Sequence, residues 1–216
     1  MTETDPLDAV DWPLHTERLL IRRCAPDDVD AAWHYRRLPE VHDWLSTTTT
    51  DPATFAELFI QPGRLAVTLM VELDGVVIGD LMLRIEDAWA QDATRDQARR
   101  TQAELGWALD PAYGGRGHAT EAVHALIDLC FGPLGLRRVH ADCFLDNEPS
   151  WRLMERLGMR RELHSVKESL HRRLGWIDGL SYAVLAEEWP IRRTTSFSAS
   201  TTPKRTTPPR SIHGHS

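Results

Sequence analysis

The sequence lacks long apolar runs, closely spaced cysteines and an excess of positive charge. No apolar run among the 216 residues approaches the roughly 20 needed to cross a bilayer as a helix, so we expect no membrane partner. Residues 1–13 are acidic, which predicts neither a secretory signal nor a basic transit peptide. Cys24, Cys130 and Cys143 are scattered, which favours structural thiols in a reducing, cytoplasmic compartment and no metal site.

Basic residues are outnumbered: Lys+Arg total 25 against 32 Asp+Glu, a formal net charge of -7. The Ser/Thr/Pro-rich segment 194–216 holds three basic residues and no acidic one, so residues 1–193 carry 22 basic and 32 acidic residues, a net charge of -10. That balance predicts no nucleic-acid partner. It is compatible with cationic partners such as amines, or with an ordinary solvated acidic surface.

Length and composition predict one folded domain with a real core, since hydrophobic residues make up 42% of the chain. We expect an N-terminal lead over 1–13, the folded domain over 14–193 and a disordered tail over 194–216, because the tail cannot bury enough apolar surface to offset its ordering entropy.

Hydrophobic periodicity predicts a mixed α+β domain whose first half is antiparallel. A hairpin is expected around Leu73-Asp74-Gly75, and residues 87–101 are polar enough to predict a loop or excursion. The remaining expected strands are 16–23, 64–72, 76–86, 102–109, 138–144, 159–164 and 180–185, and the expected helices are 26–34, 39–45, one starting at 52, 119–131 and 150–157.

The segment from Asp110 to Glu121, DPAYGGRGHATE, joins an expected strand to the longest expected helix. Its three glycines permit positive φ and close approach of a ligand to the backbone. The helix that follows presents unpaired N–H groups suited to phosphate oxygens. A tight turn that merely reverses the chain explains the glycines equally well. The segment matches neither a P-loop nor the G-x-G-x-x-G of a dinucleotide site.

The order of these pieces resembles the GNAT family of acyl-CoA-dependent N-acetyltransferases, in the branch typified by ribosomal-protein N-terminal acetyltransferases. The resemblance implies a twisted, mostly antiparallel mixed sheet of about seven strands flanked by helices, with a V-shaped split between strands 102–109 and 138–144 that takes acetyl-CoA. The resembling stretches are TERLLIRR (16–23), DGVVIGDLML (74–83), AELGWALDPAYGGRGHATEAVHALIDLCF (103–131), LGLRRVHADCFLDNEPSWRLMERLGM (134–159) and GWIDGLSYAVLAEEW (175–189).

The resemblance also implies a set of coenzyme-binding residues. Gly114 stands where the family has Gln or Arg, so one side-chain donor is missing and Arg116 is the expected partial replacement. Asn147 maps to an asparagine that binds the pantetheine arm, although a loop or cap role explains it too. The remaining implied contacts are the backbone of Trp107, Ala108 and Leu109, and the loop residues Gly115, Gly117 and Ala119. The position of His118 in the same loop, at the start of the helix, adds a candidate polar contact.

The chemistry implied by the family needs a neutral amine. An α-amino group, with a pKa of about 8, costs about 1.4 kcal/mol to deprotonate at pH 7, so a modest base is enough. Glu104 is the candidate base or ammonium attractor; the alternative is a solvent-facing strand carboxylate. The position of the family's tyrosine acid is Met154, which leaves Ser150 or a water as the acid, with a helix-cap role for Ser150 as the alternative. Cys143 has no activating neighbour in sequence and is expected to be inert.

Taken together, these features predict an N-acetyltransferase that moves acetyl from acetyl-CoA to a primary amine by direct attack in a ternary complex. The acceptor is either a protein N-terminal α-amine or a small amine such as an aminoglycoside or polyamine. A non-catalytic acyl-CoA-binding module of the same fold is the alternative from another class. The sequence does not determine the oligomeric state, and the resemblance, whose members often pair through late strands, allows a homodimer.

Overall fold

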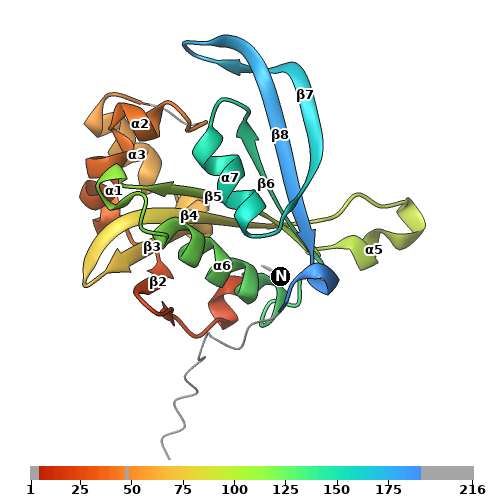
Figure 1. Ribbon diagram of the computed structural model, residues 1–216. Coiled ribbons are helices and arrows are strands. Elements are labelled where there is room, and N and C mark those ends of the chain that lie inside the picture. The colour runs from red at the N-terminus through yellow and green to blue at the C-terminus, as the bar shows by residue number, and fades with distance from the viewer. Residues whose placement is uncertain (1–4, 47–48, 191–216) are drawn as a thin grey trace, which may run out of the picture.

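The computed structural model describes residues 5–46 and 49–190, so the predicted tail over 194–216 lies outside the described residues. The described chain forms one sheet with strand order β1-β2-β3-β4-β5-β6-β8-β7, flanked by helices (Figure 1). The strands are β1 Leu14–His15, β2 Leu19–Arg23, β3 Thr68–Leu73, β4 Val76–Glu86, β5 Gln102–Leu109, β6 Arg138–Phe144, β7 Arg160–His171 and β8 Gly175–Leu185. The α-helices are α1 Val29–Arg36, α2 Pro39–His42, α3 Pro52–Phe59, α4 Pro62–Val67, α5 Arg95–Ala98, α6 His118–Phe131 and α7 Glu148–Arg156. Short 3₁₀ turns lie at η1 Pro6–Ala9, η2 Pro26–Asp28, η3 Asp92–Thr94, η4 Pro111–Tyr113 and η5 Ala186–Glu188.

Every neighbouring pair of strands is antiparallel except β5 and β6, which confirms the predicted mixed, mostly antiparallel α+β fold. The sheet has eight strands where about seven were expected. The short β1, which pairs with β2 through Leu14 and His15, is too brief to show a periodicity of its own. Leu7 of the N-terminal lead is buried in the main core, with Val10 and Trp12 packed against it, so this part of the lead belongs to the folded domain.

The β3–β4 hairpin forms where the sequence predicts it. Asp74 and Gly75 both have positive φ, at 51° and 79°, as a tight two-residue connection requires. The predicted start of the first hairpin strand at residue 64 is wrong. Pro62 begins helix α4, and the strand starts only at Thr68. Proline at the first helical position favours this start, and the apolar residues after it fit a helix as well as a strand.

The late strands are longer than their hydrophobic pattern predicts. β7 continues to His171 and β8 begins at Gly175, so the two form a hairpin that extends beyond the rest of the sheet (Figure 1). Most β7 side chains are exposed, since β7 is the last strand of the sheet order. An edge strand with two solvated faces has no alternation to detect. The 87–101 segment is an excursion, as predicted, and contains the short helix α5.

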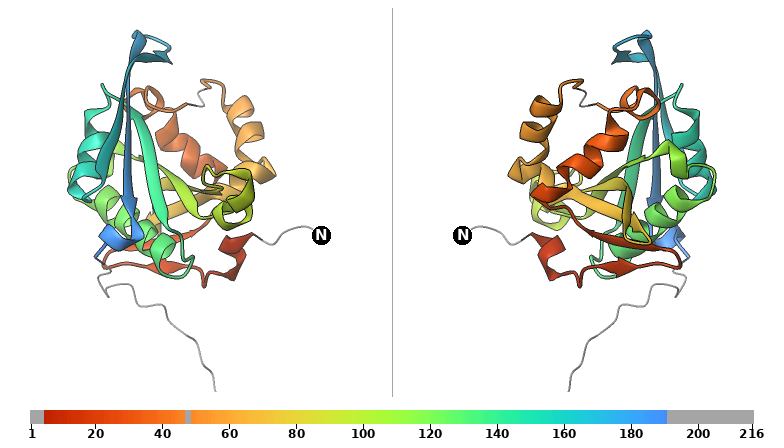
Figure 2. Two further views of the ribbon diagram at one scale, coloured as in Figure 1. Left: turned by 90° about the vertical axis from the view of Figure 1, so that its right-hand side faces the viewer. Right: turned by 90° about the vertical axis from the view of Figure 1, so that its left-hand side faces the viewer.

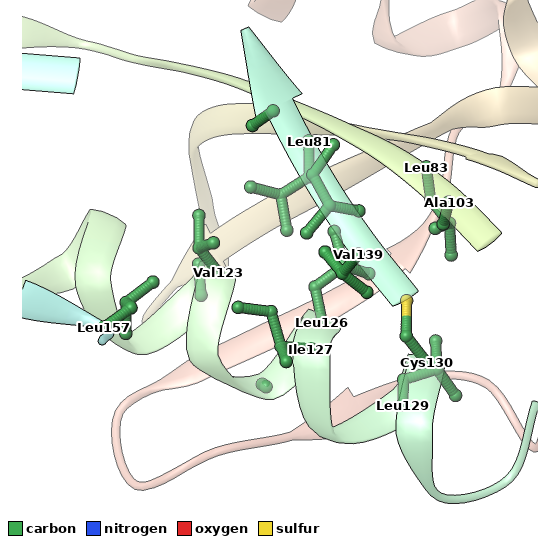
Figure 3. Close-up of a cluster of buried hydrophobic side chains, with 14 of the residues drawn as sticks. Leu81, Leu83, Ala103, Val123, Leu126, Ile127, Leu129, Cys130, Val139 and Leu157 are labelled. Carbon is green, nitrogen blue, oxygen red and sulfur yellow. The ribbon is translucent and has the colours of Figure 1, made fainter. Parts of the chain in front are cut away.

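Helices cover both faces of the sheet (Figure 2). α6 packs on one face through Val123, Leu126, Ile127 and Cys130, which meet Leu81, Leu83, Ala103 and Val139 from the central strands (Figure 3). α1 and α3 cover part of the other face in a second cluster that includes Tyr35, Phe55, Phe59, Met70 and Ala108. Burial of side chains of this size stabilises the fold by roughly 1.5–3 kcal/mol each. The two helical layers therefore hold the central strands β4, β5 and β6 in place.

The two central parallel strands are paired over only part of their length. β5 pairs with β4 from Gln102 to Leu109, and β6 pairs with β8 from Arg138 to Phe144. Between β5 and β6, however, pairing runs only from Gln102 to Glu104, opposite Arg138 to His140. Beyond that rung the strands part, which is the V-shaped split that the family resemblance implies. The facing edges of the two strands are left without a strand partner there.

Candidate active site

The glycine-rich segment after β5 is a shaped, exposed loop. The Asp110 carboxylate accepts from the Ala112 amide at 2.9 Å and so caps the 3₁₀ turn η4. Gly115 and Gly117 then adopt positive φ, 71° and 82°, and Gly117 is the N-cap of α6. Residues 114–117 are exposed. Because L side chains rarely adopt this φ, the glycines are there for the path of the backbone into the helix.

The main-chain amides of residues 115–120, in the second half of this loop and the start of α6, are uncommitted. The first backbone hydrogen bond of α6 runs from the Glu121 amide to the Gly117 carbonyl at 3.0 Å. Within residues 5–46 and 49–190, no hydrogen bond engages the amides of residues 115–120. These N–H groups lie at the positive end of the α6 dipole, which is an arrangement that binds anions. The loop can therefore take phosphate oxygens.

The predicted loop residues differ in what they can offer. The Gly114 amide donates to the Pro111 carbonyl at 2.9 Å, so Gly114 offers neither a side chain nor a free amide. Arg116 is exposed. The His118 side chain is only 5% exposed, and its Nδ1 atom has no hydrogen-bond partner among the described residues. Ala119 packs partly against the core beside it.

Two residues that sequence reasoning did not single out hold this loop. Arg18, in the turn between β1 and β2, donates from Nη1 to the Arg116 carbonyl at 2.9 Å and from Nε to Glu121 Oε2 at 2.7 Å. Glu121, in the first turn of α6, also accepts from Thr16 Oγ1 at 2.5 Å. These residues lie in the stretches TERLL (16–20) and ATEA (119–122), both of which are part of the resemblance to the GNAT family. Neither stretch by itself shows that the two segments are in contact.

Trp107, Ala108 and Leu109 lie on β5 beyond its last pair with β6. The Trp107 and Leu109 side chains pack against the core beneath α6, and Ala108 belongs to the opposite cluster under α1 and α3. The side chains are thus used for packing. The backbone edge that faces the split remains available to an extended ligand.

Asn147 and Ser150 lie at the other side of the split, where β6 leads into α7. Asn147 is the N-cap of α7, yet its side chain makes no capping hydrogen bond. The side-chain amide of Asn147 is therefore free for another partner, whereas its main-chain amide donates to the Phe144 carbonyl at 3.0 Å. The residue occupies the N-cap position by its backbone only. α7 begins at Glu148, so Ser150 lies inside the first turn and is not its cap.

Burial raises the pKa of the Cys143 thiol to about 11, and the nearby Ser150 side chain offsets only part of that rise. The thiol therefore stays protonated near neutral pH, in agreement with the inert role predicted for it. Met154, at the position of the family's tyrosine, is fully buried in the core.

Glu104 lies on the last rung that joins β5 to β6. It is opposite Arg84 on β4 and opposite His140 on β6. Its neighbours Ala103 and Leu105 face the α6 core, so alternation along the strand directs Glu104 to the other face. Glu104 Oε2 accepts from Arg84 Nη1 at 2.6 Å, in a pair that is 26% and 52% exposed. Sequence reasoning did not find Arg84 or His140 here, because only the register brings them to this rung.

Beside Glu104, His140 is held by a second carboxylate. His140 Nε2 lies 2.8 Å from Glu86 Oε1, and the same oxygen accepts from Gln102 Nε2 at 2.9 Å. The vertex of the split thus carries two carboxylates, an imidazole and a guanidinium on one face of the sheet. These groups can attract an ammonium group and accept a proton from it.

The tip of the β7–β8 hairpin is fastened to α2. Asp43 pairs with both Arg172 and Arg173, and His171 Nε2 lies 2.8 Å from the Asp43 carbonyl. His171 Nδ1 accepts from two backbone amides, those of residues 173 and 174, at 3.2 Å each, so Nε2 carries the hydrogen and donates it to Asp43. Trp44 lies 5.6 Å from the His171 ring and 6.5 Å from Phe144, the last residue of β6. An aromatic wall therefore stands at the open end of the split.

Comparison with known proteins settles the family. The family model for the acetyltransferase (GNAT) domain matches residues 18–160, which include the loop, the split and the first turn of α7. The chain belongs to the GNAT acetyltransferase family. A GNAT-family acetyltransferase from Bacillus anthracis has a similar structure, with a TM-score of 0.67 and 30% identity over 82% of this chain and 100% of that one.

Relatives by sequence carry the same description. The uncharacterized N-acetyltransferase YnaD of Bacillus subtilis is 40% identical over 86 residues, which is 40% of this chain and 50% of that protein, so the match spans half of YnaD's length. The uncharacterized N-acetyltransferase p20 of Bacillus licheniformis is 28% identical over 150 residues, 69% of this chain and 83% of that protein. Mycobacterium smegmatis RimJ, solved in complex with CoA-disulfide, shares the fold with a TM-score of 0.64 at 24% identity, over 83% of this chain and 88% of that one.

Within residues 5–46 and 49–190, no group of three or more His, Cys, Asp and Glu side chains is arranged to hold a metal ion. No helix in the same ranges is long and apolar enough to cross a membrane.

Proposed function

We propose that this GNAT protein transfers acetyl from acetyl-CoA to a primary amine. The observation that carries the proposal is the combination of free amides at residues 115–120 with a split that begins after Glu104 and ends beside that loop. A ligand with a polyanionic head and an extended, amide-containing arm fits both features. The net-acidic chain otherwise repels such an anion, so these local donors are needed.

The residues present fit the parts of acetyl-CoA. The amides of Gly115, Gly117 and Ala119 would hold the pyrophosphate, with Arg116 as a nearby cation and a polar contact from His118. The edge of Trp107, Ala108 and Leu109 would pair with the pantetheine arm, as an added strand pairs with an open edge. Asn147 would donate from its free side-chain amide across the split. Gly114 contributes to the path of the loop alone.

Acetyl-CoA supplies an activated acyl group on a thiolate leaving group. The chain's part is to deliver a neutral amine and to hold the thioester carbonyl. Glu104 attracts the ammonium form and accepts its proton, directly or through water, and Arg84 holds the carboxylate in place. Backbone N–H groups of β5 polarise the carbonyl. Ser150 or a water protonates the leaving thiolate. A thiolate needs this proton less than an alkoxide would, because a thiol has a pKa of about 8.5.

A protein N-terminal α-amine is the acceptor we favour. Deprotonating it at pH 7 costs about 1.4 kcal/mol, against about 4.6 kcal/mol for a lysine side chain, so one strand carboxylate is enough. The alternative is a small amine such as an aminoglycoside or polyamine, which the acidic chain would attract. A module that binds acyl-CoA without turnover is the alternative from another class, and the missing side-chain donor at Gly114 and the buried Met154 are what favour it.

An acceptor screen tests the proposal. The protein is incubated with acetyl-CoA and three panels: peptides with free α-amines, the same peptides blocked at the N-terminus, and polyamines with aminoglycosides. CoA release and an added acetyl mass are read by mass spectrometry. Transfer to free but not blocked peptides supports the α-amine acceptor, and transfer to the third panel supports the small-amine alternative. CoA binding with no release on any panel supports the non-catalytic module and contradicts the enzyme.

A further inference from the structure

Arg18 touches the coenzyme loop from a distant part of the chain. Its guanidinium spans two elements: Nη1 donates to the Arg116 carbonyl at 2.9 Å, while Nε and Nη2 reach Glu121 Oε2 at 2.7 and 2.6 Å. A Cβ placed on Gly117 would lie 3.4 Å from Arg18 Nη2. A single side chain thus contacts the loop just before the N-cap of α6 and the first turn of that helix.

Glu121 accepts the hydrogen bonds that connect the turn before β2 to α6. Its Oε1 atom accepts from the Thr16 hydroxyl at 2.5 Å and from the Arg18 amide at 2.9 Å, and its Oε2 atom takes the guanidinium. Although burial alone would raise it, the hydrogen bonds from Thr16 and Arg18 lower the pKa of Glu121 below its usual value. Both ends of the turn before β2 are therefore fastened to the start of α6.

The contact orients the peptide between Arg116 and Gly117. In a trans peptide the C=O and N–H groups point in opposite directions. When the Arg116 carbonyl turns toward Arg18, the Gly117 amide must turn away from it, toward the side where no described residue accepts it. The direction of that donor therefore depends on a guanidinium that lies outside the loop.

We infer that Arg18 is a positioning residue for the pyrophosphate loop, acting with Glu121 to aim the free amides that follow Arg116. The inference rests on the proposed function, since it concerns the same coenzyme. It also accounts for the two motif stretches TERLL and ATEA, whose residues Thr16 and Glu121 are 105 positions apart and yet in contact. By holding the shape of the loop backbone, Arg18 offsets the absence of a side-chain donor at Gly114.

Calorimetric affinity for CoA and for 3′-dephospho-CoA tests the inference. Both ligands carry the pyrophosphate, so Arg18→Ala is expected to weaken both by about tenfold. Arg18→Lys keeps the charge, but lysine lacks the planar guanidinium that bridges the carboxylate and the carbonyl. This variant should therefore bind both ligands at least about fivefold more weakly than the natural protein does. Arg95→Ala is the matched control, because it removes another exposed arginine and its pair with Asp92, outside the coenzyme loop. It should leave both affinities unchanged.

A second set of variants separates positioning from simple loss of stability. Glu121→Gln should also lower the affinity for CoA. The double variant Arg18→Ala/Glu121→Gln should bind CoA no more weakly than Arg18→Ala does, since the two residues act as one unit. Additive losses, full rescue by Arg18→Lys, or an Arg18→Ala affinity equal to that of Arg95→Ala would each overturn the inference. Should Arg18→Ala not fold, Arg18→Lys and Glu121→Gln carry the test. Failure of the natural protein to bind CoA would instead contradict the proposed function.

Discussion

Gly117 is the position where the loop assignment can be tested most directly, by comparing Gly117→Ala with Gly117→Glu. Gly117 has φ 82° and caps α6, so any L residue there pays a backbone cost of about 1–2 kcal/mol. The added Cβ meets only Arg18 Nη2 at 3.4 Å, a contact that needs little adjustment. Both variants share this cost, and they differ in the size and charge of the side chain.

The charge sets the size of the expected difference. A carboxylate about 5 Å from a phosphate charge is repelled by about 3 kcal/mol at an effective dielectric constant of 20, which is more than a hundredfold in affinity. A Glu side chain that turned to Arg18 instead would draw the guanidinium away from the Arg116 carbonyl, and so would also weaken binding. We therefore expect Gly117→Ala to lose at most about tenfold in CoA affinity and Gly117→Glu to lose detectable binding.

The assay is titration calorimetry with CoA, alongside thermal unfolding without ligand. Gly115→Ala is the control for the backbone cost alone, because Gly115 has φ 71° and nothing lies within 4 Å of its added Cβ. Comparable melting temperatures for the two alanine variants would show that this cost is shared. Equal CoA affinities for Gly117→Glu and Gly117→Ala would refute the pyrophosphate loop.

Three further outcomes are expected. Glu104→Gln should slow turnover by about 10²-fold or more with CoA affinity unchanged, whereas full activity across the pH range would remove Glu104 as the base and leave His140 as the next polar group on that rung. Alkylation of Cys143, followed by peptide mass spectrometry, should be slow at pH 7 and rise toward pH 11, because the thiol gives up its proton only as pH approaches its raised pKa of about 11; fast labelling at neutral pH would contradict the burial argument. Leu126→Ala should cost about 2–5 kcal/mol in denaturant unfolding, since Leu126 is fully buried beneath the sheet, and a loss under 1 kcal/mol would mean that this core repacks.

Local sequence alone determined the elements that frame the split. The bounds 76–86, 102–109 and 138–144 follow from alternation between turn signals, and they agree with β4, β5 and β6. The start of α6 was predicted within one residue, because the apolar face that runs through Ala119, Ala122 and Val123 begins there. These features depend on residues close together in the chain, where the periods of strand and helix are visible.

Only the tertiary structure decided which residues meet at the site. Register places Arg84 and His140 beside Glu104, and packing brings Thr16 and Arg18 onto Glu121. It also decided that residues 62–67 form a helix and that β7 runs to His171, where the pattern was ambiguous or absent. The physical reason is the same in each case. Contacts between distant segments depend on how layers pack and strands align, and a single sequence records neither.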